Sequence, residues 1–94
     1  MKKTLYQVAY ISYDTMDNYM FTQLYPPTTD EDKAIADYEQ EVRNKISECE
    51  ELKRDGSIEW FNVNRKDGQA TICICHNGSI EDVRILFRIY EVEV

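Results

Sequence analysis

The stretch of sequence that decides the fold runs from Thr28 to Gly56 and reads TTDEDKAIADYEQEVRNKISECEELKRDG. Thr28 and Glu31 have the spacing of a capping box at a helix start, and Gly56 suits the left-handed position just beyond a helix end. Between them, apolar residues recur at steps of three and four, the spacing that lines one side of an α-helix. They are Ile35, Tyr38, Val42, Ile46, Cys49 and Leu52. We therefore expect one long amphipathic helix over this stretch.

A second stripe of the same helix is acidic. At about 100° per residue it lies roughly opposite the apolar stripe, so it should face water. Five of its six residues are carboxylates, and the stripe consists of Asp37, Glu41, Asn44, Glu48, Glu51 and Asp55. Residues 30–55 hold ten acids and five bases, a net charge of −5 out of −7 for the whole chain. This stripe is the strongest functional signal in the sequence.

Strand-forming residues precede the helix. From Thr4 to Tyr13, aromatic, β-branched and small apolar residues occur on both alternating faces, as in a strand that is covered on two sides. Residues 14–18 (DTMDN) have the composition of a turn, and Tyr19 to Tyr25 read as the returning strand of a hairpin. Pro26 and Pro27 end that strand because neither proline can donate to a strand ladder.

Two turns punctuate the sequence after the helix. Asp67-Gly68 and Asn77-Gly78 are dipeptides that tolerate the positive φ angles of a type I′ hairpin turn. Pairing about these turns places eight apolar residues on one face, toward the helix. They are Phe61, Val63, Ile72, Ile74, Val83, Ile85, Phe87 and Ile89. Ser79 and Asp82 also have capping-box spacing, so residues 79–84 form either a short helix or a strand. The β-branched residues that follow favour the strand.

The predicted order is therefore ββαβββ, which defines an α+β fold with two layers. We expect an antiparallel sheet of about five strands with one long helix packed on one face, in a single domain of residues 1–94.

The same register predicts which residues lie on the face of the sheet that the helix leaves open. They are Trp60, Asn62, Thr71, Cys73, Cys75, Ile80, Arg84, Leu86, Arg88 and Tyr90. Aromatic residues and arginine are enriched in protein interfaces, so Trp60, Leu86 and Tyr90 are candidate interface residues. The open face docks a partner, joins a second copy in a homodimer, or is a half-wet sheet surface with scattered apolar residues.

The segment Cys73-Ile74-Cys75-His76 has a superficial likeness to a metal or catalytic motif. In a strand the two cysteines share a face about 7 Å apart, while His76 points to the other face. Zinc needs four converging ligands, and a Cys–His pair needs the base within hydrogen-bond reach of the thiol. The third cysteine, Cys49, belongs to the helix, and the three glycines are used by a cap and two turns rather than by a phosphate loop. We therefore predict no catalytic residues, no metal site and no cofactor.

The net charge of −7 disfavours several kinds of partner. It repels phosphate backbones and anionic lipids, so we expect neither direct nucleic-acid binding nor membrane binding. Lys2 and Lys3 are followed by a polar, alternating segment rather than by the apolar run of a signal peptide. Three cysteines, an odd number, suit reduced thiols in a cytoplasmic protein.

These observations favour a non-enzymatic module that binds a protein partner. Carboxylates spaced by roughly 5 to 10 Å along the helix imitate a phosphate backbone and fit the basic groove of a nucleic-acid-handling protein. The partner-binding residues would be Asp37, Glu41, Glu48, Glu51 and Asp55. A stoichiometric inhibitor of this kind is typical of phages and mobile elements.

Two alternatives stay open. The acidic stripe is also what an ordinary solvated helix face looks like. From a different class, the chain could be a small ligand-binding or catalytic domain with a pocket between helix and sheet, or at a dimer interface, lined by Tyr and Cys side chains. A cavity or a buried polar group between helix and sheet would favour this second alternative.

Overall fold

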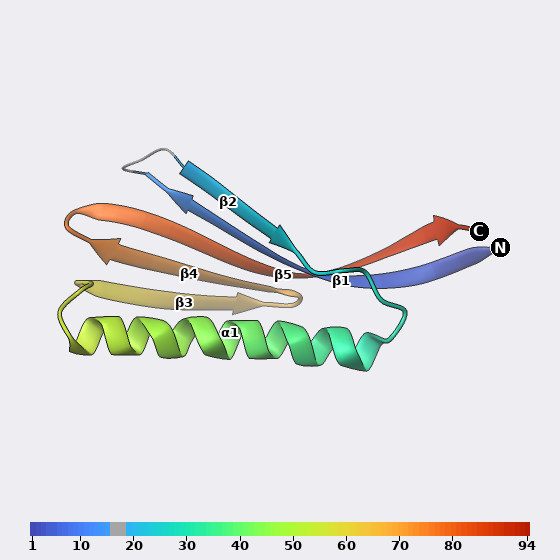
Figure 1. Cartoon of the computed structure of the whole chain (residues 1–94), viewed down its shortest axis with the longest axis horizontal. Coiled ribbons are helices and arrows are strands. Elements are labelled where there is room, and N and C mark those ends of the chain that lie inside the picture. The colour runs from blue at the N-terminus through green and yellow to red at the C-terminus, as the bar shows by residue number, and fades with distance from the viewer. Residues whose placement is uncertain (16–18) are drawn as a thin grey trace.

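The computed structural model describes residues 1–15 and 19–94, which form one antiparallel sheet and one long helix (Figure 1). The elements in chain order are β1 (Lys2–Asp14), β2 (Tyr19–Leu24), α1 (Glu31–Arg54), β3 (Trp60–Lys66), β4 (Gln69–His76) and β5 (Ser79–Glu93). The strand order in the sheet is β2-β1-β5-β4-β3. This confirms the predicted ββαβββ order and the α+β class. The turn predicted over residues 14–18 falls largely on residues 16–18, which lie outside the described residues.

The N-cap of α1 lies two residues after Thr28, the position that the capping-box prediction gives it. Asp30 is the N-cap residue, and its carboxylate accepts a hydrogen bond from the backbone N–H of Lys33 at 3.1 Å. Thr28 is held in an extended bridge to Tyr6, with two backbone hydrogen bonds of 2.8 and 2.9 Å. The predicted Thr28–Glu31 capping box is therefore wrong, because a long-range contact with β1 keeps Thr28 out of the helix.

The inner side of α1 is rotated slightly from the predicted apolar stripe. Its buried residues are Ala34, Tyr38, Val42 and Cys49. Ile35, which was predicted to cover the sheet, is 43% exposed. It lies about 100° around the helix from Ala34 and so reaches only the margin of the packed layer. At the other end Gly56 has a φ of +83°, as the sequence predicts.

The register of the last three strands matches the prediction. Phe61 is paired with Ile74 and Val63 with Ile72, and Ile72 is paired in turn with Val83. The core between helix and sheet contains Val8, Tyr38, Val42, Cys49, Ile58, Ala70, Ile72, Ile74, Val83 and Ile85. Residues 79–84 belong to β5, so the strand alternative is correct there and the short helix is not.

Only one of the two predicted type I′ turns is present. Asn77 and Gly78 have φ angles of +52° and +78°, as this turn requires. At the other turn Gly68 has a positive φ but Asp67 does not, so the turn between β3 and β4 has a different type.

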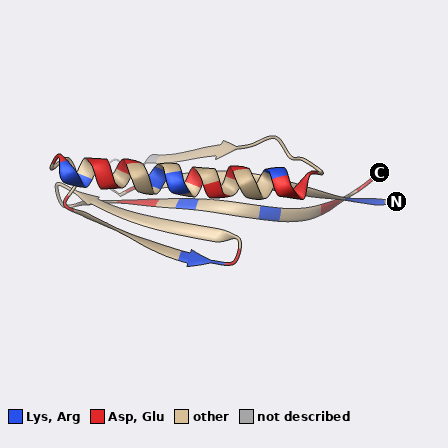
Figure 2. Ribbon diagram, turned by 90° about the horizontal axis from the view of Figure 1, so that it is seen from below, with Lys and Arg blue, Asp and Glu red and all other residues tan. Residues whose placement is uncertain are grey.

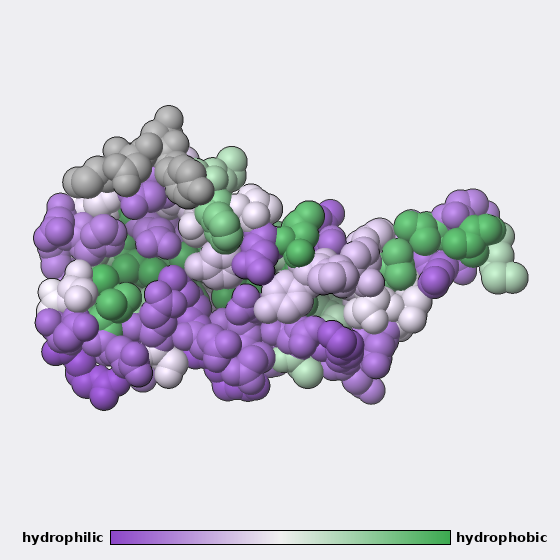
Figure 3. All heavy atoms as spheres, viewed as in Figure 1, coloured by the Kyte–Doolittle hydropathy of each residue, from purple (hydrophilic) through white to green (hydrophobic). Residues whose placement is uncertain are grey.

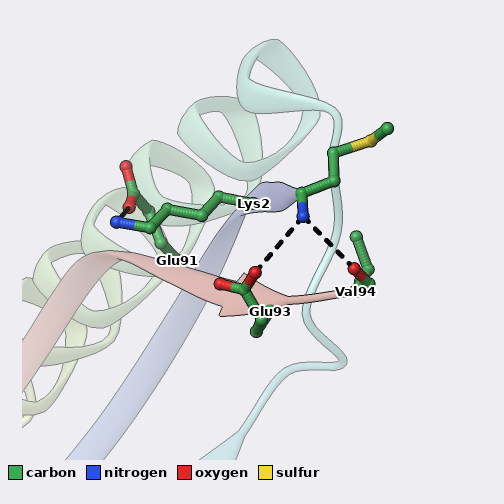
Figure 4. A network of polar contacts seen from close by, with 5 residues as sticks. Lys2, Glu91, Glu93 and Val94 are labelled. Atoms are coloured by element: carbon green, nitrogen blue, oxygen red, sulfur yellow. Dashed lines mark hydrogen bonds and ion pairs between the residues drawn. The ribbon is translucent and has the colours of Figure 1, made fainter.

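The molecule is elongated, with extents of 52 × 25 × 19 Å and a radius of gyration of 15.2 Å, against about 12 Å for a compact chain of this length. The first residues of β1 and the last of β5 project beyond α1 as a two-stranded arm (Figures 1 and 2). Lys2 forms an ion pair with Glu91 at 3.7 Å, and the amino group of Met1 lies 3.2 Å from Glu93 (Figure 4). Among the described residues, no helix combines the length and apolarity needed to cross a membrane.

Candidate functional site

A groove of about 360 Å³ runs between α1 and the edge strand β2. A volume of this size falls within the range of ligand and side-chain binding sites in proteins. One side consists of sheet residues Tyr10, Phe21 and Gln23, and the helix side consists of Glu41, Asn44, Lys45 and Glu48. The groove therefore combines aromatic rings with carboxylates, amides and one ammonium group.

Strand alternation and helix periodicity bring these side chains together. Gln23 is paired with Tyr10, and Phe21 lies two residues before Gln23, so all three point to the helix side of the sheet. The rings of Tyr10 and Phe21 meet edge to face, with centroids 6.2 Å apart. On α1, Glu41 and Glu48 are seven residues apart, which places both on one flank about 10.5 Å from each other along the axis.

The acidic stripe lies beside this groove rather than on the outermost side of the helix. Asp37 and Glu41 are half-buried, whereas Glu48, Glu51 and Asp55 are exposed. The reason is geometric, because the stripe is about 100° around the helix from the buried residue Tyr38 rather than 180°. The prediction that the whole stripe faces water is therefore wrong for Asp37 and Glu41 and correct for the other four residues, Asn44 included.

Several of these carboxylates have partners within the molecule. The Lys33 ammonium lies 2.9 Å from the Asp37 carboxylate, and Lys45 lies 3.5 Å from Glu48. Asp55 accepts a hydrogen bond from the backbone N–H of Ser57 at 2.9 Å, and bonding to Ser57 lowers the pKa of Asp55. The stripe is thus partly neutralised, and charge alternates along α1 (Figure 2).

Glu41 is tied to the loop that follows β2. Burial raises the pKa of Tyr25, and the charge of Glu41 and a hydrogen bond to it raise the pKa further. The phenol therefore stays protonated and can donate to Glu41 at neutral pH. A phenol carries no positive charge, so this contact is a hydrogen bond and not an ion pair.

Lys45 is the basic group of the groove wall and is largely enclosed. Its side chain is 12% exposed and lies near Tyr10, Glu48 and Glu81. Burial acts to lower the pKa of Lys45, but these three neighbours outweigh it and the pKa is raised. Lys45 also borders a second cavity of about 220 Å³, which His76 and Glu81 help to line. An ammonium group held in its charged form anchors the helix but has no free electron pair for nucleophilic attack.

The three thiols are also held in their protonated forms. Cys73 donates to Asp82 at 2.9 Å, and this hydrogen bond, followed by burial, raises the pKa of Cys73. Burial and a 3.3 Å hydrogen bond to Glu59 raise the pKa of Cys75, and burial raises that of Cys49. Thiols are poor nucleophiles and ligands until they ionise. Among the described residues, no group of three or more His, Cys, Asp or Glu side chains is placed to hold a metal ion.

The three predicted interface residues share the open face of the sheet but do not form one patch. Trp60, which is 41% exposed, is paired with Cys75 at the β3 edge. Leu86 is paired with Ala9 in the middle of the sheet, and Tyr90 lies on the arm opposite Leu5. Apolar character continues along this arm, while the surface over α1 is hydrophilic (Figure 3).

A denser apolar patch on the open face lies over β2 and β1. Met20 and Leu24 are 63% and 54% exposed, and Ile11 and Tyr13 lie beside them on β1. These residues are absent from the predicted interface, because that prediction used only the register of the last three strands. Alternation along β2, which places Met20, Thr22 and Leu24 on one side, is the signal that identifies them.

The open face is positive although the chain is negative. By strand alternation, the described residues of this face include four bases, Lys3, Lys66, Arg84 and Arg88, and one acid, Asp82, with Glu59 at its margin. Two such faces brought together would place like charges against each other, which disfavours a symmetric face-to-face homodimer.

Comparisons with protein-family models, with curated proteins and with solved structures find no match to this chain.

Proposed function

We propose that this protein is a non-enzymatic module that binds a basic protein partner at the groove between α1 and β2. The observation that carries this proposal is the position of Glu41 and Glu48 on the wall of a groove that also contains Tyr10 and Phe21. Carboxylates and aromatic rings are the groups that bind the ammonium of Lys or the guanidinium of Arg. The net charge of −7 would speed the approach of such a partner.

Inhibition of a nucleic-acid-handling protein, as by a phage or mobile-element inhibitor, is the specific form of this proposal. The exposed carboxylates of Glu51 and Asp55 support it by extending the negative surface from Glu48, on the groove wall, toward the end of α1. Asp37 and Glu41 would act differently from a phosphate row, because both are half-buried and Asp37 is paired with Lys33.

The non-enzymatic part of the proposal is supported by the chemistry of the candidate nucleophiles. Lys45 has a raised pKa, and so do Cys49, Cys73 and Cys75. Each of these groups is held in its unreactive form at neutral pH. The three free thiols also suit the reducing cytoplasm, which we propose as the location of the protein.

A small-molecule binding site in the same groove is the second candidate function. One feature favours it, the largely buried ammonium group of Lys45 on the groove wall. The buried hydroxyl of Tyr38, which has no hydrogen-bond partner among the described residues, does not belong to the lining of this groove. Lys45 would then bind an anionic group of the ligand, which is the opposite charge preference from the first proposal. Binding of the peptide described below, or of a small carboxylic acid such as benzoate, separates the two.

The test uses a fluorescein-labelled peptide of sequence KKKKVVVV at low salt, with binding measured by anisotropy. The double variant Glu41→Gln/Glu48→Gln should weaken binding about 5- to 30-fold, as expected for the loss of two charge-assisted contacts. The matched control Glu50→Gln/Asp67→Asn removes the same charge from exposed sites outside the groove and should weaken it less than about twofold. Equal weakening in the two variants would mean that the peptide responds to overall charge, and the groove proposal would then fail.

A further inference from the structure

The outer edge of β2 is unprotected. Among the described residues β2 pairs only with β1, from Ala9↔Leu24 to Asp14↔Tyr19. Its six residues, YMFTQL, include no charge and no proline, and Met20, Phe21 and Leu24 are all exposed. Proteins normally guard such edges with charged residues or proline, because a free apolar edge accepts another strand.

The opposite edge of the sheet shows the contrast. β3 carries Arg65 and Lys66 at its end, and Asn62 and Asn64 alternate with its apolar residues. The Arg65 guanidinium reaches the Glu39 carboxylate of α1 at 2.9 Å, which links this edge to the helix. One edge of the sheet is therefore protected and the other is open.

The surroundings of β2 specify what kind of strand would fit beside it. Side chains of an added strand would alternate between the two faces of the sheet. Those on the helix side would lie beside Phe21 and Gln23 and face Glu41 and Glu48 across the groove. Those on the other side would extend the apolar patch that contains Met20 and Leu24.

We infer that the partner adds an extended segment to the free edge of β2, with basic and apolar residues in alternation. This inference rests on the proposed function and says how the partner would be recognised. The mode is strand addition, in which backbone hydrogen bonds provide affinity and alternate side chains provide specificity. Side chains at alternate strand positions lie about 7 Å apart, and Glu41 and Glu48 lie about 10.5 Å apart along the helix axis. Two long, flexible lysine side chains can span this difference and reach both carboxylates. A second copy fits less well, because β2 contains no Lys or Arg to place in the groove.

Three labelled peptides with the same eight side chains test the inference by anisotropy. The first is KVKVKVKV, the second is the block peptide KKKKVVVV, and the third is KVKVKVKV with N-methyl groups at positions 2, 3, 6 and 7. Methylation at these positions removes N–H donors from both edges of the peptide without changing its charge. We expect the alternating peptide to bind at least tenfold more tightly than the other two, and its binding to slow amide hydrogen exchange in β2. The three peptides are compared on the unaltered protein, so a difference between them cannot come from a change in its fold.

The outcomes separate the two proposals. If the three peptides bind equally and Glu41→Gln/Glu48→Gln weakens all of them, strand addition is wrong and the groove proposal stands. If no peptide responds to the groove variant more than to Glu50→Gln/Asp67→Asn, both proposals fail. If light scattering shows a dimer whose formation protects the β2 amides and excludes the peptide, the occupant of the edge is a second copy and the inference is wrong.

Discussion

Replacing Val42 with Ala should destabilise the protein much more than replacing Ile35 with Ala, although isoleucine is the larger side chain. Val42 is fully buried in the core, whereas Ile35 is 43% exposed. Removing two carbons from Val42 costs about 1.6 kcal/mol in lost burial, and the cavity left behind raises the cost to about 2–3 kcal/mol. Water fills the space left by Ile35, so its loss should cost less than about 1 kcal/mol. Both substitutions introduce alanine, which favours the helix over valine and isoleucine by similar amounts, so this stabilising effect cancels when the two variants are compared.

Urea unfolding followed by circular dichroism measures the free energy of unfolding of each variant, and thermal unfolding measures its melting temperature. The melting temperature should fall by roughly 8–24 °C for Val42→Ala, at about 4–8 °C per kcal/mol for a domain of this size. For Ile35→Ala the fall should stay below about 8 °C. If Ile35→Ala is as destabilising as Val42→Ala, the helix sits in the orientation that the apolar stripe alone predicts. The rotation that places Glu41 beside the groove would then be wrong.

Three further outcomes follow from individual polar contacts. Asp30→Ala removes the helix cap that binds the Lys33 amide and should cost about 1 kcal/mol in urea unfolding, whereas Asp30→Asn should cost little. The pKa of Asp55 is lower in the folded protein than in the unfolded chain, because its carboxylate bonds to Ser57. The ionised carboxylate therefore stabilises the fold fully at pH values above the unfolded pKa, and this stabilisation is lost as pH falls through the folded pKa. Asp55→Asn should therefore flatten the pH dependence of stability below about pH 4, and an unchanged acid limb would contradict the assignment. Asp82→Asn should lower the pKa of Cys73 and so increase its rate of iodoacetamide labelling at pH 8, detected by mass spectrometry of the labelled peptide.

The sequence was sufficient to predict the helix and the three strands that follow it because their signals are local. Alternating apolar residues fix the faces of β3, β4 and β5, and a turn dipeptide marks each connection between them. The start of the helix was misplaced for the opposite reason. The pairing of Thr28 with Tyr6 joins residues 22 positions apart, and no local pattern shows it.

The candidate site was only partly predictable. The acidic stripe was found from helical spacing, but its orientation depends on which residues tolerate burial against the sheet. Ala34 is buried although it is small, and Lys45 is largely buried because its aliphatic stem packs against the protein. A search for large hydrophobic residues does not find either of them, so it places the inner side of the helix slightly wrongly. The groove itself requires β2 to lie beside α1, a juxtaposition that arises from the whole sheet rather than from either segment.

The central pairing of the sheet joins the first strand to the last. Every residue of β1 from Lys2 to Asp14 is paired with a residue of β5, and the closest such pair in sequence, Asp14 and Glu81, is 67 positions apart. Loop-closure entropy opposes contacts of this range, so the slow step of folding is expected to be the docking of the β1–β2 hairpin onto a preformed α1–β3–β4–β5 unit. Until that step occurs, both central strands expose their backbone edges to other chains. Fidelity of assembly in a crowded cell then depends on how quickly the two ends of this polypeptide meet.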